Sequence, residues 1–346
     1  MGHPLRAQQD QSHAARSRSR HPRAPKWPSY RGTSHFIGLS PSGRVTVFVD
    51  ASLGKKALQN GRDLVADADR VATANDAIFG TRGGPVSVIV FALGGATDGS
   101  GGADHMGCDF TTGAAIEVCA SFGNPARVSA LFEAELSECS MNGNLCGEST
   151  GEALSRWCAA VVGSNALADF ATAPRWAQDG MPDFVSRTDA TDQSADSTGC
   201  GVAFISWLIS LGHGLETIAP AMVRLGDTGT LAQLYGNLTG DDPKHAWPRF
   251  QRAIKSLPDG VTDDDPFGAM AHARQLLQPS PWTAEVTSRA VAAIAVDVAA
   301  GCRPEQILAS VRAAMQPLAE PAGAAVCRPH SRKLLPPGKS KPRRPK

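Results

Sequence analysis

The chain has 346 residues, enough for one large domain or two domains of ordinary size. Apolar residues make up 42% and charged residues 19%, so a sizeable core can form and a wholly disordered chain is excluded. The longest strongly apolar stretch, Val202–Leu211, has about half of the roughly 20 residues that a membrane-spanning helix needs. We therefore expect a soluble protein without a transmembrane segment.

The two ends of the chain are basic and the middle is acidic. The net charge of +1 divides into +6 for residues 1–35, +8 for residues 328–346 and −13 for the residues between them. The ends are rich in Arg, Ser and Pro and contain little apolar surface to bury, which predicts disordered basic tails at 1–40 and 326–346. Such tails are solvated ends, or they contact a polyanion or an export apparatus.

The N-terminal sequence and the spacing of the cysteines predict a cytoplasmic protein. The basic start is not followed by the apolar run of about 7–15 residues that a secretory signal needs, so non-classical secretion is the alternative. The eight cysteines show no CxxC or Cys/His spacing of a zinc finger. Free thiols are expected; one or two disulfides remain an alternative, with Cys139 and Cys146 the nearest pair in sequence.

The first part of the chain predicts a small mixed sheet with a helix. Apolar residues recur at helical spacing from Leu58 to Ile78, and Gly80 ends this pattern. A glycine-rich stretch, Gly94–Cys108, contains His105. Alternating or continuous apolar runs predict strands at 44–50, 86–93 and 114–119.

The rest of the chain predicts helices, which makes the fold class α+β. Asn124 followed by Pro125 is a typical helix start, and this helix should reach about Met141. Ser149 should cap the next helix, and further helices are expected at about 165–171, 174–178, 198–211, 215–225, 230–238 and 244–256. Ala-rich helices at about 267–277, 283–300 and 304–318 predict a helical appendage over 258–325, which leaves 41–257 as the main domain.

Two glutamates on the helix from Asn124 are the first candidate site residues. Glu135 lies one turn from Phe132 and Cys139 of the apolar stripe, and Glu138 is three residues further on. Carboxylates that face a core are costly unless they are paired, protonated or bound to a cation. A rim position with salt bridges is the alternative interpretation.

Glu152 is the third candidate. It opens the following helix in the sequence Ser149-Thr-Gly-Glu152, which also fits a capping box and needs no chemistry.

The order of these elements resembles the gluzincin-type metallopeptidase fold, and more narrowly the plant basic secretory proteins and their bacterial relatives. In that family one helix carries His-Glu-x-x-His and the next carries a glutamate that binds zinc. Here the phrases read Ala134-Glu-Leu-Ser-Glu138 and Gly151-Glu-Ala-Leu-Ser-Arg-Trp157. The resemblance covers about residues 44–256. It implies that Glu135 occupies the place of the general base and Glu152 that of the third metal ligand.

Both histidines of the family motif are missing, since Ala134 and Glu138 occupy their places. A hydrolytic zinc site needs nitrogen or sulfur ligands and an open position for water. We therefore expect a degenerate site in a non-catalytic or binding protein, without a cofactor. The alternative is a hydrolase whose divalent cation is held by Glu135, Glu138 and Glu152, with His105 replacing a missing ligand. A third interpretation is an interaction protein that acts through its basic tails.

Overall fold

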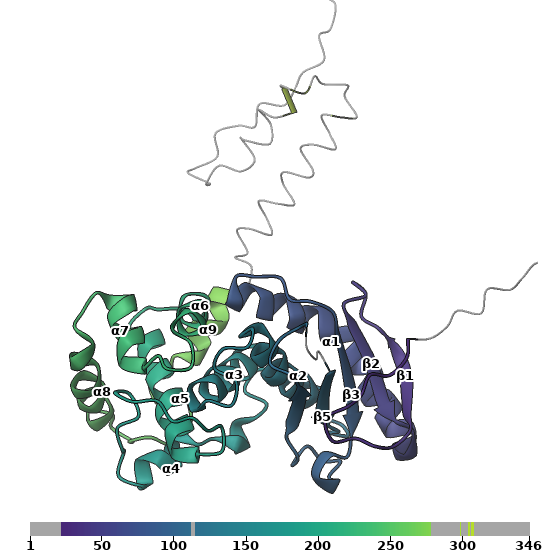
Figure 1. The fold of residues 1–346 in the computed structure, drawn as a ribbon, viewed down its shortest axis with the longest axis horizontal. Helices are drawn as coiled ribbons and strands as arrows, with labels where there is room; N and C mark the ends of the chain where they lie inside the picture. Colours follow the sequence, from purple (N-terminus) through teal and green to yellow (C-terminus); the bar gives the residue numbers. More distant parts are fainter. Residues whose placement is uncertain (1–21, 112–114, 278–297, 299–303, 305, 308–346) are drawn as a thin grey trace, which may run out of the picture. The chain divides into compact units, whose positions relative to one another are not determined.

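The computed structural model describes residues 22–111 and 115–277, together with the single positions 298, 304, 306 and 307. The chain divides into two compact units, residues 1–277 and 278–346, and the description below concerns the first. A mixed sheet from the first half of this unit is followed by helices, which confirms the α+β fold class (Figure 1).

The sheet has five strands in the order β1-β2-β3-β5-β4. The central pairs β2–β3 and β3–β5 are parallel, and the outer pairs β1–β2 and β4–β5 are antiparallel. The sequence predicted the three central strands but neither edge strand. The bounds are β1 Ser34–Leu39, β2 Val45–Asp50, β3 Val86–Phe91, β4 Ala103–Met106 and β5 Ala115–Cys119.

Helices α1 (Gly54–Phe79) and α2 (Pro125–Ser140) pack on one face of the sheet. α1 crosses over between the parallel strands β2 and β3 and ends where Gly80 adopts a left-handed conformation, at φ 67°. α2 begins at Asn124, whose side chain accepts a hydrogen bond from the amide of Arg127, as the sequence predicted. The parallel strands contribute continuous valine and isoleucine to the core because both of their faces are covered.

The N-terminal residues 22–33 cover the opposite face of the sheet, so the predicted disordered tail is wrong from residue 22 onward. Trp27 and Tyr30 are buried there in a cluster with Phe48 and Ile89. The carboxylate of Glu117, itself fully buried on β5, accepts hydrogen bonds from the amides of Ser29 and Tyr30 and from the hydroxyl of Ser29. Two aromatic anchors and one buried acceptor outweigh the polar composition of the segment.

The second half of the unit is helical, close to the prediction. α3 packs against α2 and α5. Helices α4, α7 and α9 also contact α5, which is buried along nearly its whole length. The bounds are α3 Ser149–Val162, α4 Ala173–Gln178, α5 Ala195–Ser210, α6 Leu215–Leu225, α7 Leu231–Thr239, α8 Ala246–Lys255 and α9 Met270–Leu277, with short 3-10 turns at Ala51–Leu53, Leu93–Gly95, Ala168–Phe170 and Pro243–His245.

The predicted boundary between a main domain ending at 257 and an appendage starting at 258 does not fit the structure. Asp264 accepts hydrogen bonds from the amides of Thr172 and Ala173 at the start of α4. Asp265 accepts from Ser206 on α5 and from two amides at the start of α9. These aspartates therefore attach the segment 258–277 to the first unit.

The other predictions for the two ends fall on residues that the structure does not describe: the tails at 1–21 and 326–346 and, apart from four single positions, the helices at 283–300 and 304–318. In the described part of the chain, none of the helices has the length and apolar character required to cross a bilayer.

Replacement of Glu117 by Gln tests the N-terminal anchor. The glutamine side chain keeps one acceptor oxygen, but its NH₂ group would face the hydrogen-bond donors of Ser29 and Tyr30. The free energy of unfolding should therefore fall by about 1.5–3 kcal/mol, as expected for the loss of hydrogen bonds to a charged group. Urea denaturation measures this change. The exposed Glu216 provides the control, because Glu216→Gln should stay close to wild type. Equal stability of both variants would contradict the anchor.

Candidate functional site

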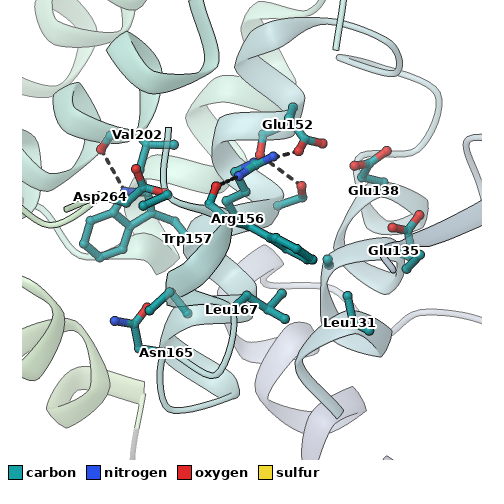
Figure 2. A pocket seen from close by; sticks show the side chains of 18 of the residues that line it. Leu131, Glu135, Glu138, Glu152, Arg156, Trp157, Asn165, Leu167, Val202 and Asp264 are labelled. Atoms are coloured by element: carbon teal, nitrogen blue, oxygen red, sulfur yellow. Dashed lines mark hydrogen bonds and ion pairs between the residues drawn. The ribbon is translucent and has the colours of Figure 1, made fainter. Parts of the chain in front are cut away.

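A cavity of about 680 Å³ lies beside α2 and α3 and contains the candidate residues that the sequence singled out. Glu135 and Glu138 enter it from α2 and Glu152 enters it from α3 (Figure 2). His105 lines it from the edge strand β4. Its volume lies within the range of about 300–1,000 Å³ that is typical of small-molecule sites. All four candidate residues therefore line the same cavity. The sequence did not predict the strand that carries His105.

His105 and the two glutamates of α2 form one cluster. Nδ1 of His105 lies 2.8 Å from Oε2 of Glu135 and 3.6 Å from Oε2 of Glu138. The side chains are only 12%, 12% and 16% exposed, so water screens their charges weakly. The cluster offers one nitrogen and two carboxylate oxygens, all within 4.8 Å of one another, which is a ligand set for a divalent cation.

Local structure explains how these residues meet. β4 pairs with β5 in antiparallel register, with His105 opposite Ile116, and this places the imidazole at the edge of the sheet next to α2. On α2, Glu135 and Glu138 are one turn apart and therefore point to the same side. A histidine in a glycine-rich stretch has no periodicity that would predict this contact.

Burial and mutual repulsion shift the pKa of each group in the cluster. Burial raises the pKa of Glu138 to about 8, with further increases from the charges of Glu135 and Glu152 that exceed the opposing effect of His105. Burial also raises the pKa of Glu135, against the hydrogen bond from His105. For His105 burial alone would lower the pKa, but the hydrogen bond and charge of Glu135, with Glu138 and Asp104, raise it. The cluster therefore retains protons near neutral pH that exposed groups would release.

Glu152 faces the same cavity but is not part of this cluster. Its carboxylate oxygen lies 2.7 Å from Nε of Arg156, one turn further along α3. The predicted capping box is wrong as well, because Glu148 is the N-cap residue and Glu152 binds a guanidinium instead of the backbone. Of the four predicted site residues, the structure therefore brings together His105, Glu135 and Glu138 and pairs the fourth with Arg156.

The lining of the cavity combines many carboxylates with an apolar wall. Eight Asp and Glu residues line it, against one arginine and one histidine. Some of these carboxylates are engaged in the fold, since Asp264 and Asp265 bind backbone amides. Apolar side chains complete the wall: Leu131, Trp157, Leu167 and Phe170. The sequence contained no indication of this apolar wall, because three separate segments form it: α2, α3 and residues 165–171.

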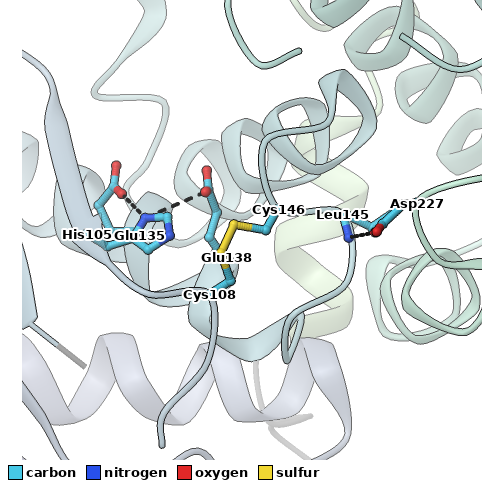
Figure 3. Close-up of a disulfide and its surroundings, with 7 residues drawn as sticks. All are labelled: His105, Cys108, Glu135, Glu138, Leu145, Cys146 and Asp227. Carbon is cyan, nitrogen blue, oxygen red and sulfur yellow. Dashed lines mark hydrogen bonds and ion pairs between the residues drawn. A yellow bond between two sulfur atoms is a disulfide. The ribbon is translucent and has the colours of Figure 1, made fainter. Parts of the chain in front are cut away.

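A disulfide between Cys108 and Cys146 lies next to the cluster (Figure 3). It joins the loop after β4 to the loop between α2 and α3, with a Cα–Cα distance of 5.9 Å. The expectation of free thiols is wrong for this pair, and Cys139 is a buried free cysteine and not the partner of Cys146. The pairing joins residues 38 positions apart, so sequence proximity was no guide.

In comparisons with known proteins, no family model, no curated protein and no solved structure matches this chain. The assignment of a role to the cavity therefore depends on its own geometry.

The raised pKa of Glu138 predicts how stability varies with pH. Between the ordinary value of 4.5 and the folded value of about 8, the folded protein binds a proton that the unfolded chain has released. The free energy of unfolding should therefore fall as pH rises through this interval and level off above it, and the raised pKa of His105 adds a loss in the same direction. Glu138→Gln should make the fall shallower and leave the protein about 1–2 kcal/mol more stable than wild type at pH 8.5.

Urea denaturation at a series of pH values in metal-free buffer measures this difference. The control is Glu216→Gln, which removes an exposed carboxylate and should give a curve parallel to wild type. A parallel curve for Glu138→Gln would show that Glu138 ionises as an ordinary exposed glutamate.

Proposed function

We propose that this chain is a metallopeptidase-like binding protein whose acidic cavity holds an organic cation the size of a basic amino-acid side chain. The observation that carries the proposal is the composition of the cavity. Eight carboxylates and an apolar wall surround a volume far larger than one metal ion needs. Carboxylates supply charge complementarity for a guanidinium or ammonium group, and the apolar wall suits the methylene stem of the same side chain.

Glu138 is the group best placed to respond to such a guest. Its carboxylate is not engaged in a short ion pair, since the nearest cationic nitrogen, Nδ1 of His105, lies at 3.6 Å. Because its pKa is about 8, the group is largely neutral at pH 7 and becomes anionic at higher pH. A guest whose charge is constant should therefore bind more tightly as pH rises from 6.5 to 9.

The loss of zinc-dependent hydrolysis is the second part of the proposal. In the gluzincin-type metallopeptidases that the sequence resembles, the first histidine of the motif binds zinc, and Ala134 stands at this place without a ligand atom. Glu152, at the place of the third ligand, forms an ion pair with Arg156. A carboxylate that is paired with a guanidinium is a poor metal ligand, because the cation must displace the arginine.

Calorimetric titration with two end-capped tripeptides, Ala-Arg-Ala and Ala-Glu-Ala, tests the binding role. The arginine peptide should bind and the glutamate peptide should not. Affinity for the arginine peptide should increase with pH for wild type, whereas Glu138→Gln should bind about tenfold more weakly at pH 9 and show no pH dependence. Glu216→Gln should behave as wild type. Equal affinity for both peptides, or none for either, would contradict the proposal.

A metal-dependent hydrolase is the second candidate, and the contact between His105 and Glu135 is the observation that favours it. These two residues and Glu138 provide three ligands and leave positions open for water, as catalytic metal sites do. If this candidate is correct, Mn²⁺ or Zn²⁺ should raise the melting temperature of wild type but not of Glu138→Gln. The arginine peptide should then be cleaved in the presence of the ion and remain intact with a chelator.

A further inference from the structure

His105 also belongs to a second group of potential ligands, on the side of the disulfide. One of its ring nitrogens and the two sulfur atoms of Cys108 and Cys146 all lie within 4.8 Å of one another. Imidazole and two thiolates are a preferred set for zinc, with Zn–S distances of about 2.3 Å and Zn–N distances of about 2.0 Å. In tetrahedral geometry these distances place neighbouring ligand atoms about 3.5–3.8 Å apart. Displacements of the sulfur and nitrogen atoms by about 1 Å, through side-chain rotation, would therefore bring them to this geometry.

The two cysteine-bearing loops are held together by more than the disulfide. The amide of Gly143 donates a hydrogen bond to the carbonyl of Cys108, with an N–O distance of 2.7 Å. On the other side, the amide of Leu145 donates to the carboxylate of Asp227, and the Leu145 side chain is buried (Figure 3). A Cβ at Gly151 would collide with the carbonyl of Leu145, so the loop also fits closely against the start of α3. The thiols should therefore remain neighbours after the S–S bond is broken.

The disulfide is accessible to a reductant, unlike the other described cysteines. Cys108 and Cys146 are both partly exposed. The free cysteines are fully buried: Cys119, Cys139, Cys158 and Cys200. A dithiol reductant in solution can thus reach this one pair in the described part of the chain without unfolding it.

We propose that reduction of the Cys108–Cys146 disulfide by a dithiol creates a zinc site formed by His105, Cys108 and Cys146. The dithiol donates two electrons and two protons, so that the S–S bond is replaced by two thiols while the reductant becomes a disulfide. Zinc then binds both sulfurs as thiolates, and the two thiol protons pass to solvent. With three protein ligands the ion keeps a fourth position open, as catalytic zinc ions do.

Glu135 acts as a positioning residue for this site. Its carboxylate holds Nδ1 of His105 at 2.8 Å, which leaves Nε2 as the nitrogen for the ion. A carboxylate on the far nitrogen of a zinc-bound imidazole fixes the orientation of the ring and increases its basicity. The zinc site is independent of the proposed cation-binding function, because it uses the sulfur side of His105 and needs no guest in the cavity.

Titration with Co²⁺ tests the proposal, because a thiolate ligand gives this ion a charge-transfer absorption band that oxygen and nitrogen ligands do not give. All proteins carry Ser in place of Cys302 and Cys327, which lie outside the described residues. After reduction with dithiothreitol and its removal without oxygen, the protein should bind one Co²⁺ per chain with the thiolate band, and Zn²⁺ should displace it. The oxidised protein should give no such band.

Three variants show which residues hold the ion. Cys108→Ser should reduce the thiolate band to about half and weaken binding at least tenfold, and Glu135→Gln should weaken binding by about tenfold while the full band remains, as expected for an outer partner of a ligand. Glu216→Gln should match the parent. Circular dichroism of each reduced protein verifies the fold. A folded, reduced parent protein without the thiolate band, or a band unchanged by Cys108→Ser, would overturn the proposal.

Discussion

The burial of α2 is the constraint on which the rest of the structure depends. This helix packs against α1 and α3 and against strands β4 and β5, and it carries three glutamates into these contacts. Glu133 is fully buried, both of its carboxylate oxygens lack a hydrogen-bond partner among the described residues, and burial raises its pKa well above the ordinary value. Carboxylates in such surroundings must take up a proton or a cation.

Glu135 and Glu138 meet the same constraint in a different way, because the cavity opens on their side of the helix. His105 supplies a nitrogen to both of them, and the remaining volume is available to a guest. The imidazole in turn links the carboxylates to the disulfide, since one ring faces both groups. A single side chain, His105, therefore lies within 4.8 Å of both these two carboxylates of the cavity and the sulfur atoms of Cys108 and Cys146.

The sequence predicted those parts of the fold and site that depend on local pattern. The periodicity of α1, the cap at Asn124 and the inward-facing position of Glu135 all follow from residues close together in the chain. Features that depend on distant partners were not predictable. Trp27 lies in a polar, proline-rich segment, and the partner of Ser29 and Tyr30, Glu117, is more than 80 residues away.

The same reason explains the errors at Glu152 and the cysteines. The sequence Ser149-Thr-Gly-Glu152 satisfies a capping box in its letters, yet an arginine one turn further on provides a stronger partner for the carboxylate than a backbone amide. Cys146 is nearest in sequence to Cys139, but Cys139 faces the core from α2, whereas the loop around Leu145 brings Cys146 to Cys108.

The ionisation of His105 tests most directly the claim that buried carboxylates control this site. Nitrogen-15 NMR of the imidazole, assigned by comparison with His105→Gln, reports the pKa and the protonation of each ring nitrogen in metal-free protein. The account predicts a pKa above the ordinary value of 6.5, with Nδ1 still protonated after the imidazole becomes neutral, because Glu135 holds that proton. A pKa at or below 6.5, with the proton on Nε2 in the neutral form, would contradict it.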